Sequence, residues 1–201
     1  LKKFLLSKKI WCAASTHATE EKFCGLAHKE LKKKYQNLLT IIIPRHINRS
    51  KSIMYEMQKL NLKVHMHESK NKIDRNTDIY LVDSFGKTKS FFKICKIVFL
   101  GGSMIAHGGQ NPLEPARFGC KIIHGENIWN FKEIYKLLNN NNISQKVINL
   151  NQMTNKIVKM YSNKANSKNI ESKIRKLGDK ILNLTLKEVN FLLSKNETKK
   201  T

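Results

Sequence analysis

The residues best suited to bind a ligand gather in the segment GGSMIAHGGQNPLEPARFG, residues 101–119. Four of the nine glycines and two of the three prolines of the chain fall between Gly101 and Pro115. Glycines that directly follow a strand let the backbone turn sharply and approach a ligand closely. Asn111 before Pro112 is typical of a helix start, where free amides and the helix dipole favour a phosphate. The spacing indicates either a phosphate-binding loop or an ordinary tight turn before a well-capped helix.

Two charged or titratable side chains of this segment add to the chemistry. Glu114, one turn into the expected helix, is placed to accept hydrogen bonds from vicinal hydroxyls such as those of a ribose. His107 lies inside the loop, where a histidine is either a simple hydrogen-bonding residue or a group that stabilises a departing anion. A nucleotide is therefore the ligand that these residues would suit, and an ordinary tight turn stays the alternative.

Polar residues also follow the first two expected strands. Thr16 and His17 come after the first strand, and Pro44 and Arg45 come after the second. Because the carboxyl ends of parallel strands meet at one edge of a sheet, three strand ends should converge on one cleft there. The nearby residues 19–21 (Thr-Glu-Glu) are interpreted as helix-capping residues.

No familiar metal or nucleophile motif is evident in the sequence. The seven histidines and four cysteines show no metal-ligand spacing, and His65 and His67 form a strand-like pair without further ligands. The four cysteines form no CxxC pair and are interpreted as buried thiols of a reducing compartment. No GxSxG, Walker or HExxH pattern occurs.

Short apolar runs alternate with amphipathic segments along the chain. Strands are expected at residues 9–15, 38–43, 62–66, 78–82, 97–100 and 121–124. Helices are expected at residues 23–35, 49–60, 89–95, 112–118, 130–138, 152–161 and 170–193, with polar loops at 139–142 and 162–169. Strands that are apolar throughout are typical of a sheet buried on both faces. The fold class is therefore α/β: a Rossmann-like parallel sheet covered by helices.

The net charge of +23 arises from 38 Lys and Arg against 15 Asp and Glu. Only five of the 38 basic residues are Arg, and Lys, Asn and Ile, all encoded by A/T-rich codons, are abundant. Genome composition is the simplest explanation, and attraction to an anionic membrane is a second. Nucleic-acid binding is a weaker third, because contacts with nucleic acid favour Arg and interleaved aromatic residues.

A length of 201 residues supports one substantial core but not two full nucleotide-binding domains. The longest apolar stretches, residues 38–44 and 97–102, are far too short to span a bilayer, and no signal-peptide pattern starts the chain. We therefore expect neither a transmembrane nor a secreted protein. The stripe Ile170, Ile174 and Leu177, which continues through Ile181, Leu184 and Val189, implies that the last helix packs on something, such as a domain not present here.

Three sequence blocks, in order, resemble the 3-deoxy-D-manno-octulosonic acid (Kdo) transferases of lipopolysaccharide synthesis. They are ASTH with EE at residues 14–21, IPRH at 43–46, and GGS with HGGQNPLEPA at 101–116. The resemblance runs from about residue 9 to 138 and covers the carboxyl-terminal half of such enzymes. It implies the C-terminal domain of a GT-B glycosyltransferase, in which two Rossmann-like domains face a cleft. It also implies three parts of the chain: a linker remnant at 1–8, a CMP-sugar-binding domain at 9–165, and a helix at 166–201 that packs toward the absent amino-terminal domain.

The resemblance implies transfer of Kdo from CMP-Kdo to a lipid A precursor at the cytoplasmic face of the inner membrane. No cofactor or metal is implied, and the expected partners are the donor, the acceptor and an anionic membrane surface, with no nucleic acid. By resemblance, the residues that hold CMP are Pro44, Arg45, Phe85, Gly86, Lys87, Asn111, Pro112, Leu113 and Glu114. Further candidate cleft residues are Thr16, His17, Ser103, His107, Gly108 and Gly109.

One position departs from the family pattern. An acidic residue is expected where this chain has Lys87, so backbone contacts at Phe85 and Gly86 could survive while a side-chain role at position 87 is in doubt. The catalytic base would lie in the absent half, so this chain alone should be inactive. The alternatives are another GT-B nucleotide-sugar transferase or a basic α/β module that binds nucleic acid.

Overall fold

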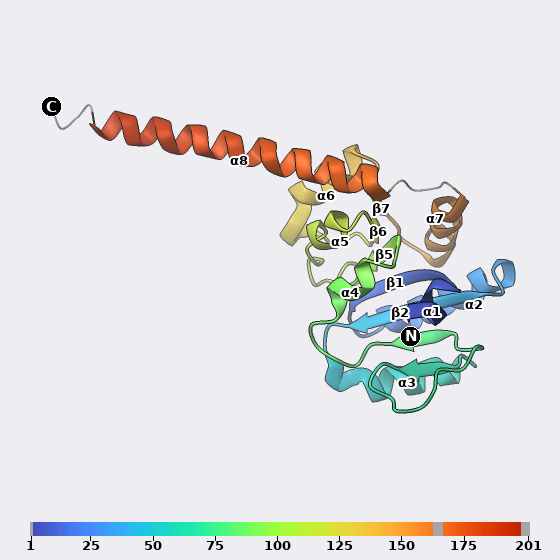
Figure 1. Ribbon diagram of the computed structural model, residues 1–201. Helices are drawn as coiled ribbons and strands as arrows, with labels where there is room; N and C mark the ends of the chain where they lie inside the picture. Colours follow the sequence, from blue (N-terminus) through green and yellow to red (C-terminus); the bar gives the residue numbers. More distant parts are fainter. Residues whose placement is uncertain (1, 163–166, 198–201) are drawn as a thin grey trace.

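The computed structural model describes residues 2–162 and 167–197. Seven parallel strands form one sheet in the order β3-β4-β2-β1-β5-β6-β7 (Figure 1). Their bounds are β1 Lys9–Thr16, β2 Leu38–Pro44, β3 Val64–Met66, β4 Ile79–Leu81, β5 Ile97–Leu100, β6 Lys121–His124 and β7 Ser144–Lys146. The predicted parallel sheet is confirmed. Six strands were expected, and β7 was missed because its sequence, SQK, has no apolar pattern and it pairs with β6 through its backbone.

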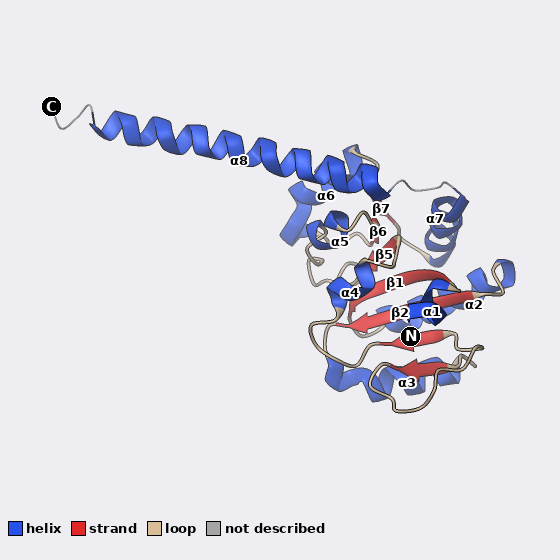
Figure 2. Cartoon of the chain, viewed as in Figure 1, coloured by secondary structure: helices blue, strands red, loops and turns tan. Residues whose placement is uncertain are grey.

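Helices lie on both sides of this sheet (Figure 2). The α-helices are α1 Lys2–Leu6, α2 Glu20–Lys34, α3 Ser50–Lys59, α4 Thr88–Phe92, α5 Leu113–Arg117, α6 Lys132–Asn140, α7 Leu150–Ser162 and α8 Ser167–Glu197. Two 3-10 turns, η1 Ile47–Arg49 and η2 Trp129–Phe131, precede α3 and α6. The seven predicted helices are confirmed with shifts of a few residues at their ends. The expected loop at 139–142 begins late, because α6 continues through Asn140.

The two faces of the sheet pack into two separate apolar clusters. Alternate residues of β1 point to opposite faces, so that Trp11 lies in one cluster and Cys12 in the other. Helices α2, α3 and α7 cover the Trp11 face, whereas α1, α4, α5, α6 and α8 contribute to the Cys12 face. All four cysteines are buried free thiols, as predicted. Burial on both faces explains why β2 is apolar along its whole length.

The two ends of the chain differ in how they join this domain. Leu5 of α1 is buried in the Cys12-face cluster, in the stretch expected to be a linker remnant. The stripe of α8 starts on the same cluster with Ile170 and Ile174 buried, but Ile181 and Leu184 are more than half exposed. Figure 1 shows α8 extending well beyond the sheet. The expected boundary between residues 165 and 166 falls in a stretch outside the described residues.

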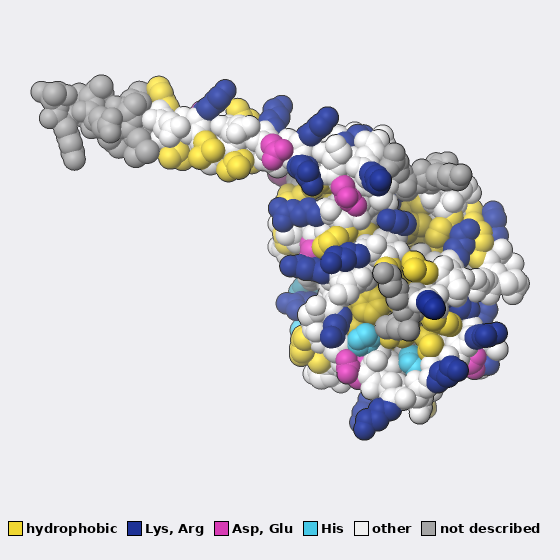
Figure 3. Space-filling view, in the orientation of Figure 1, with side chains coloured by type: hydrophobic (Ala, Val, Ile, Leu, Met, Phe, Trp, Pro, Cys, Tyr) yellow, Lys and Arg dark blue, Asp and Glu magenta, His cyan; other side chains and the backbone are white. Residues whose placement is uncertain are grey.

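None of the described helices combines the length and apolar character needed to cross a membrane. Lysine and arginine side chains are scattered over the visible face rather than gathered in one patch (Figure 3).

Candidate functional site

The candidate site lies where β1 and β5 end side by side at the carboxyl edge of the sheet. After β1 the chain continues into α2 on the Trp11 face, whereas after β5 it leads to α5 on the Cys12 face. The loops after these strands therefore diverge at a topological switch point, and in open α/β sheets the crevice beside such a point is where ligands bind. The turn after β1 and the glycine-rich loop after β5 meet there, as the sequence predicted.

A buried carboxylate holds these two loops together. Oε2 of Glu20 accepts hydrogen bonds from the amides of His17 at 2.9 Å and Gly102 at 2.7 Å. Its Oε1 accepts from the amides of Ser103 at 3.1 Å and Met104 at 3.0 Å. Glu20 is only 1% exposed. The helix-capping interpretation is wrong for Thr19, which makes no side-chain cap at the start of α2. Glu20 instead occupies the amides of residues 102–104 and removes them from ligand binding.

The tight approach of the loop to β1 requires glycine. A Cβ at Gly101 would collide with the backbone carbonyl of Ser15. At Gly102, where φ is +65°, a Cβ would lie 2.8 Å from Cδ2 of His107 and 3.3 Å from Cε1 of His17. The glycines thus bring the two histidines together over the strand ends.

Three histidines meet at this point. The rings of His17 and His107 lie 4.3 Å apart between centroids, and the ring of His46 lies 5.9 Å from that of His17. His17 is buried, whereas His46 and His107 are exposed above it. Burial, followed by the charges of His107 and His46, lowers the pKa of His17 to about 4. His17 is therefore neutral at pH 7 in the unliganded domain.

The end of β2 is joined to the end of β1 by its backbone. Pro44 pairs with Thr16, and the amide of Arg45 donates to the carbonyl of Thr16 at 2.9 Å. Arg45 is exposed, and its charge acts on His17. The predicted convergence of Thr16, His17, Pro44, Arg45 and His107 at one place is therefore present in the structure.

Ser103 faces inward rather than toward the crevice. It is fully buried, its hydroxyl donates to the carbonyl of Leu100 at 2.5 Å, and it accepts from the amide of Gly125 at 2.8 Å. These bonds tie the glycine-rich loop to the end of β6. Ser103 therefore supports the loop from inside, and the expectation of a cleft residue at this position does not agree with its burial.

The predicted cap of α5 is wrong by one residue, because Pro112 and not Asn111 stands at the N-cap position, where no side-chain cap is made. Oδ1 of Asn111 accepts a hydrogen bond from the amide of Leu113 at 3.0 Å, and Pro112 adopts a helical backbone. The helix itself begins at Leu113, one residue later than expected, and has only five residues. Glu114 lies in its first turn and is half-buried.

Residues 85–87 lie farther along the same edge, after β4, which β2 separates from β1. Phe85 is 73% exposed, and Gly86 has a φ of +73°. Lys87 lines a cavity of about 710 Å³ with residues from α1 and α4, among them Leu5 and Phe91. The structure therefore brings residues 85–87 to the predicted edge but not into the histidine cluster.

Residues 127–130, which were not predicted as part of the site, bind the glycine-rich loop through hydrogen bonds and contacts. Asn127 donates from its amide to the carbonyl of Ser103 at 2.9 Å, and Nδ2 of Asn130 donates to the carbonyl of His107 at 3.2 Å. Trp129, 55% exposed, lies against Gly108, where an added Cβ would come within 2.7 Å of its Nε1. These residues follow β6 at the same edge, so the strand-end rule used for Arg45 could have identified them.

A buried ion pair was also missed. Arg49 donates from Nη1 and Nη2 to the two carboxylate oxygens of Glu21, at 2.9 and 3.2 Å. Glu21 is fully buried at the start of α2. The pair anchors the segment that carries Arg45 and His46 against α2, so it positions site residues without entering the crevice.

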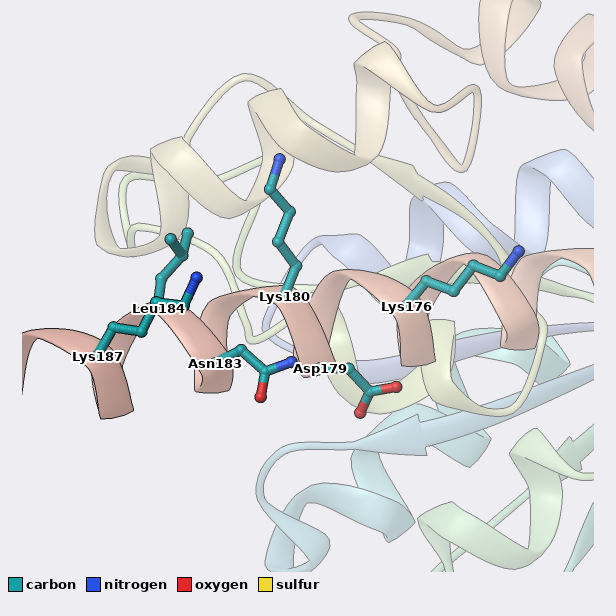
Figure 4. A pocket seen from close by; sticks show the side chains of 6 residues that line it. All are labelled: Lys176, Asp179, Lys180, Asn183, Leu184 and Lys187. Atoms are coloured by element: carbon teal, nitrogen blue, oxygen red, sulfur yellow. The ribbon is translucent and has the colours of Figure 1, made fainter.

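A second hollow, of about 420 Å³, lies on the outer part of α8 (Figure 4). One helix supplies all its lining residues: Lys176, Asp179, Lys180, Asn183, Leu184 and Lys187. Since no second element closes around it, this hollow is not a candidate ligand site. Within residues 2–162 and 167–197, no three His, Cys, Asp or Glu side chains are grouped so as to hold a metal ion.

Known proteins resemble this chain in sequence and in fold. No protein-family model matches the chain. The 3-deoxy-D-manno-octulosonic acid transferase of Haemophilus influenzae is 32% identical over 87% of this chain and 40% of its own length. That of Aquifex aeolicus is 30% identical over 82% of this chain and 45% of its own. The chain thus spans less than half the length of these relatives.

A solved structure matches the whole domain. The C-terminal CMP-Kdo binding domain of WaaA from Acinetobacter baumannii superposes with a TM-score of 0.79 at 25% identity, covering 87% of this chain and 92% of that one. A C-terminal domain of a group 1 glycosyl transferase from Francisella tularensis, at 13% identity and a TM-score of 0.56, shares the fold alone. The seven-stranded sheet and its site define the C-terminal domain of a GT-B glycosyltransferase. Within that class, the chain is a homologue of the Kdo transferases.

Proposed function

We propose that this chain is the donor-binding part of a Kdo transferase, which transfers Kdo from CMP-Kdo to a lipid A precursor (lipid IVA). The similarity to a domain described as CMP-Kdo binding, over 87% of the chain, is the observation that carries the proposal. The crevice between β1 and β5 supports it, because a nucleotide binds at such a topological switch point.

Each proposed donor contact has a physical reason. The Arg45 guanidinium, exposed at the end of β2, meets the donor phosphate or base edge. Of the backbone at residues 111–113, the proposal uses the amide of Asn111, because Pro112 has no N–H and the Leu113 amide already donates to Oδ1 of Asn111. The Glu114 carboxylate accepts from the ribose hydroxyls. Phe85 and Gly86 contribute backbone contacts, while the ammonium of Lys87 stands where the family pattern has an acid.

The chemistry divides between two halves of the enzyme. Departure of CMP from the anomeric carbon leaves negative charge on its phosphate, which Arg45 and the nearby histidines stabilise. The attacking hydroxyl of the acceptor needs a base, and the proposal assigns that base to the amino-terminal half found in the longer relatives. The isolated chain therefore binds CMP weakly and transfers no sugar.

The outer half of α8 is assigned to contact with that amino-terminal half. The apolar stripe that packs Ile174 into the core continues through Ile181 and Leu184 on the exposed part of the helix. We place the whole enzyme at the cytoplasmic face of the inner membrane, where its lipid acceptor and the net charge of +23 favour an anionic surface.

Calorimetric titration of the chain with CMP, UMP and GMP tests the proposal. We expect CMP to bind and Glu114→Ala to weaken it about tenfold, since a charged hydrogen bond is lost. Glu30→Ala, at an exposed ion pair on α2, is the matched control and leaves binding unchanged. A preference for UMP or GMP would instead favour another GT-B nucleotide-sugar transferase. Tight, steeply salt-dependent binding of duplex DNA without nucleotide selectivity would favour a nucleic-acid module.

A further inference from the structure

His17 is a buried polar side chain without a partner. It is only 9% exposed, yet neither ring nitrogen makes a hydrogen bond in the described structure. The neighbouring Thr16 hydroxyl is fully buried and equally unpaired. Buried polar atoms in folded proteins almost always have partners, so such a group beside a ligand crevice indicates that the ligand supplies the partner.

The surroundings of His17 determine what kind of partner fits. Arg45 and His46 face it from the end of β2, and His107 faces it from the glycine-rich loop. From α2, the nearest oxygen of Glu20 lies 3.7 Å from Nδ1 of His17, beyond hydrogen-bond distance. Both oxygens of that carboxylate already accept two backbone amides each. The backbone of Ser15 also interacts with His17 and raises the pKa of the ring, although neither ring nitrogen forms a hydrogen bond of regular geometry.

The one carboxylate beside the cluster, that of Glu20, already accepts four backbone amides, so the positive or protonatable groups of the cluster have no anion that is free to pair with them. The group that completes it carries negative oxygen atoms, as a phosphate does, and not another cation or an apolar ring. An anion brought against His17 also reverses the influence of its cationic neighbours and favours the protonated imidazole.

We propose that His17, His46 and His107, together with Arg45, form a receptor for a phosphate-type anion, and that this receptor takes up a proton when the anion binds. The inference rests on the proposed function in that it assigns the anion to the donor phosphate. It adds His46 to the site and makes donor binding dependent on pH. No covalent step is involved, because the proton comes from solvent and returns there when the anion leaves.

The pH dependence follows from the free state of His17. Burial and the charges of His107 and His46 hold its pKa at about 4 in the unliganded domain, so it is neutral above pH 5. Bound anion raises that pKa. Binding is then tighter at pH 6 than at pH 8, and the complex holds more protons than the separate molecules do.

The test is calorimetric titration with the methyl phosphodiester of CMP, which keeps one phosphate charge throughout this range. Titrations at pH 6 in two buffers of different ionisation enthalpy measure proton uptake directly. We expect uptake of about half a proton per site at pH 6 and an affinity that falls about twofold by pH 8, in keeping with one linked histidine. Cytidine, which lacks the phosphate, should bind without proton uptake.

The variants His17→Gln and His107→Gln remove the imidazoles, and the exposed position of His107 makes its variant safe for folding. Both should lose at least half of the proton uptake. His65→Gln is the matched control, because His65 lies on β3 and stacks on Tyr80 away from the cluster. It should behave as the unaltered chain does.

Two outcomes overturn the inference. If the ester binds without proton uptake, or if uptake survives in both variants, the receptor assignment is wrong while the proposed function stands. If neither the ester nor CMP binds, the proposed function fails and the inference fails with it.

Discussion

Glu20 is the single residue on which the geometry of the site depends most. Its carboxylate accepts hydrogen bonds from four backbone amides. One belongs to His17, three positions before Glu20, and the others belong to residues 102–104, more than 80 positions after it. In Glu20→Gln, one oxygen becomes an NH₂ group that opposes these amides. We expect a loss of about 2 to 4 kcal/mol in the free energy of unfolding, measured by urea denaturation.

The control for this change is Glu30→Gln. Glu30 pairs with Lys33 at 2.7 Å on the exposed side of α2, and such surface pairs contribute less than about 1 kcal/mol. Equal stability of the Glu20 and Glu30 variants would contradict the central role of the buried carboxylate.

Asp78 illustrates a buried polar cluster that resembles a catalytic triad but is closed to substrate. Its Oδ1 lies 3.3 Å from Nε2 of His28, and Nδ1 of that ring is hydrogen-bonded to the Thr40 hydroxyl at 2.8 Å. His28 and Thr40 are both fully buried. The Lys32 ammonium and the amide of Lys63 also donate to the Asp78 carboxylate. The cluster ties α2 to β2 and to the start of β4.

Acid stability should depend on this aspartate. Burial raises the pKa of Asp78, but the hydrogen bonds from His28, Lys32 and the Lys63 amide outweigh that effect and hold it well below the usual 3.8. A lowered folded-state pKa stabilises the fold above about pH 4 and ceases to do so as pH falls toward the folded value. Unfolding measured between pH 5 and 2 should show a smaller acid loss for Asp78→Asn. Parallel curves for the two proteins would disprove the assignment.

At the scale of elements, the segment between β6 and α6 contacts the glycine-rich loop and carries Trp129, whose fluorescence can report on binding at that loop. Of the two tryptophans, Trp11 is fully buried in β1 and Trp129 is 55% exposed beside Gly108. Ligand binding at the glycine-rich loop should change only the environment of Trp129. We expect CMP to alter the intrinsic fluorescence of the chain, and Trp129→Phe to abolish this change without abolishing calorimetric binding. A signal that persists in the variant would place the perturbation at Trp11.

The elements themselves were largely predictable from the sequence. Apolar runs such as that of β2 and amphipathic repeats such as that of α2 reflect burial, which acts residue by residue. The strand-end rule likewise located Arg45 and the glycine-rich loop. The roles of Glu20 and Arg49 were not predicted, because both residues act through contacts between distant segments. The Glu20–Gly102 hydrogen bond, for example, joins residues 82 positions apart. Neither residue type nor local spacing distinguishes such a carboxylate from a surface one.

At the scale of the whole molecule, the net charge of +23 is spread rather than focused. Figure 3 shows Lys and Arg side chains distributed over the visible face, including the part of α8 nearest the sheet. A spread charge attracts any anionic surface weakly and is screened by salt. Selectivity for a particular anion therefore has to come from a built site such as the histidine cluster.

The proposed contact between this domain and an amino-terminal half depends on the stripe of α8. Ile174 and Ile181 lie two turns apart on the same stripe, but Ile174 is 7% exposed against the core and Ile181 is 58% exposed beyond it. In the chain itself, Ile174→Ser should cost about 2 to 4 kcal/mol of unfolding free energy, whereas Ile181→Ser should cost less than about 0.5 kcal/mol. Urea denaturation of both variants measures this difference.

In a protein of the relatives' full length, Ile181→Ser should have a larger effect than it has in this chain. If the outer half of α8 packs on the amino-terminal half, Ile181→Ser places a hydroxyl in an apolar interface. This change weakens the contact between the halves. Limited proteolysis of the full-length protein should then cleave α8 faster in Ile181→Ser than in the unaltered protein, with Lys176→Ser, on the basic face, as the control. Equal cleavage of Ile181→Ser and the unaltered protein would mean that the exposed stripe serves no contact between the halves.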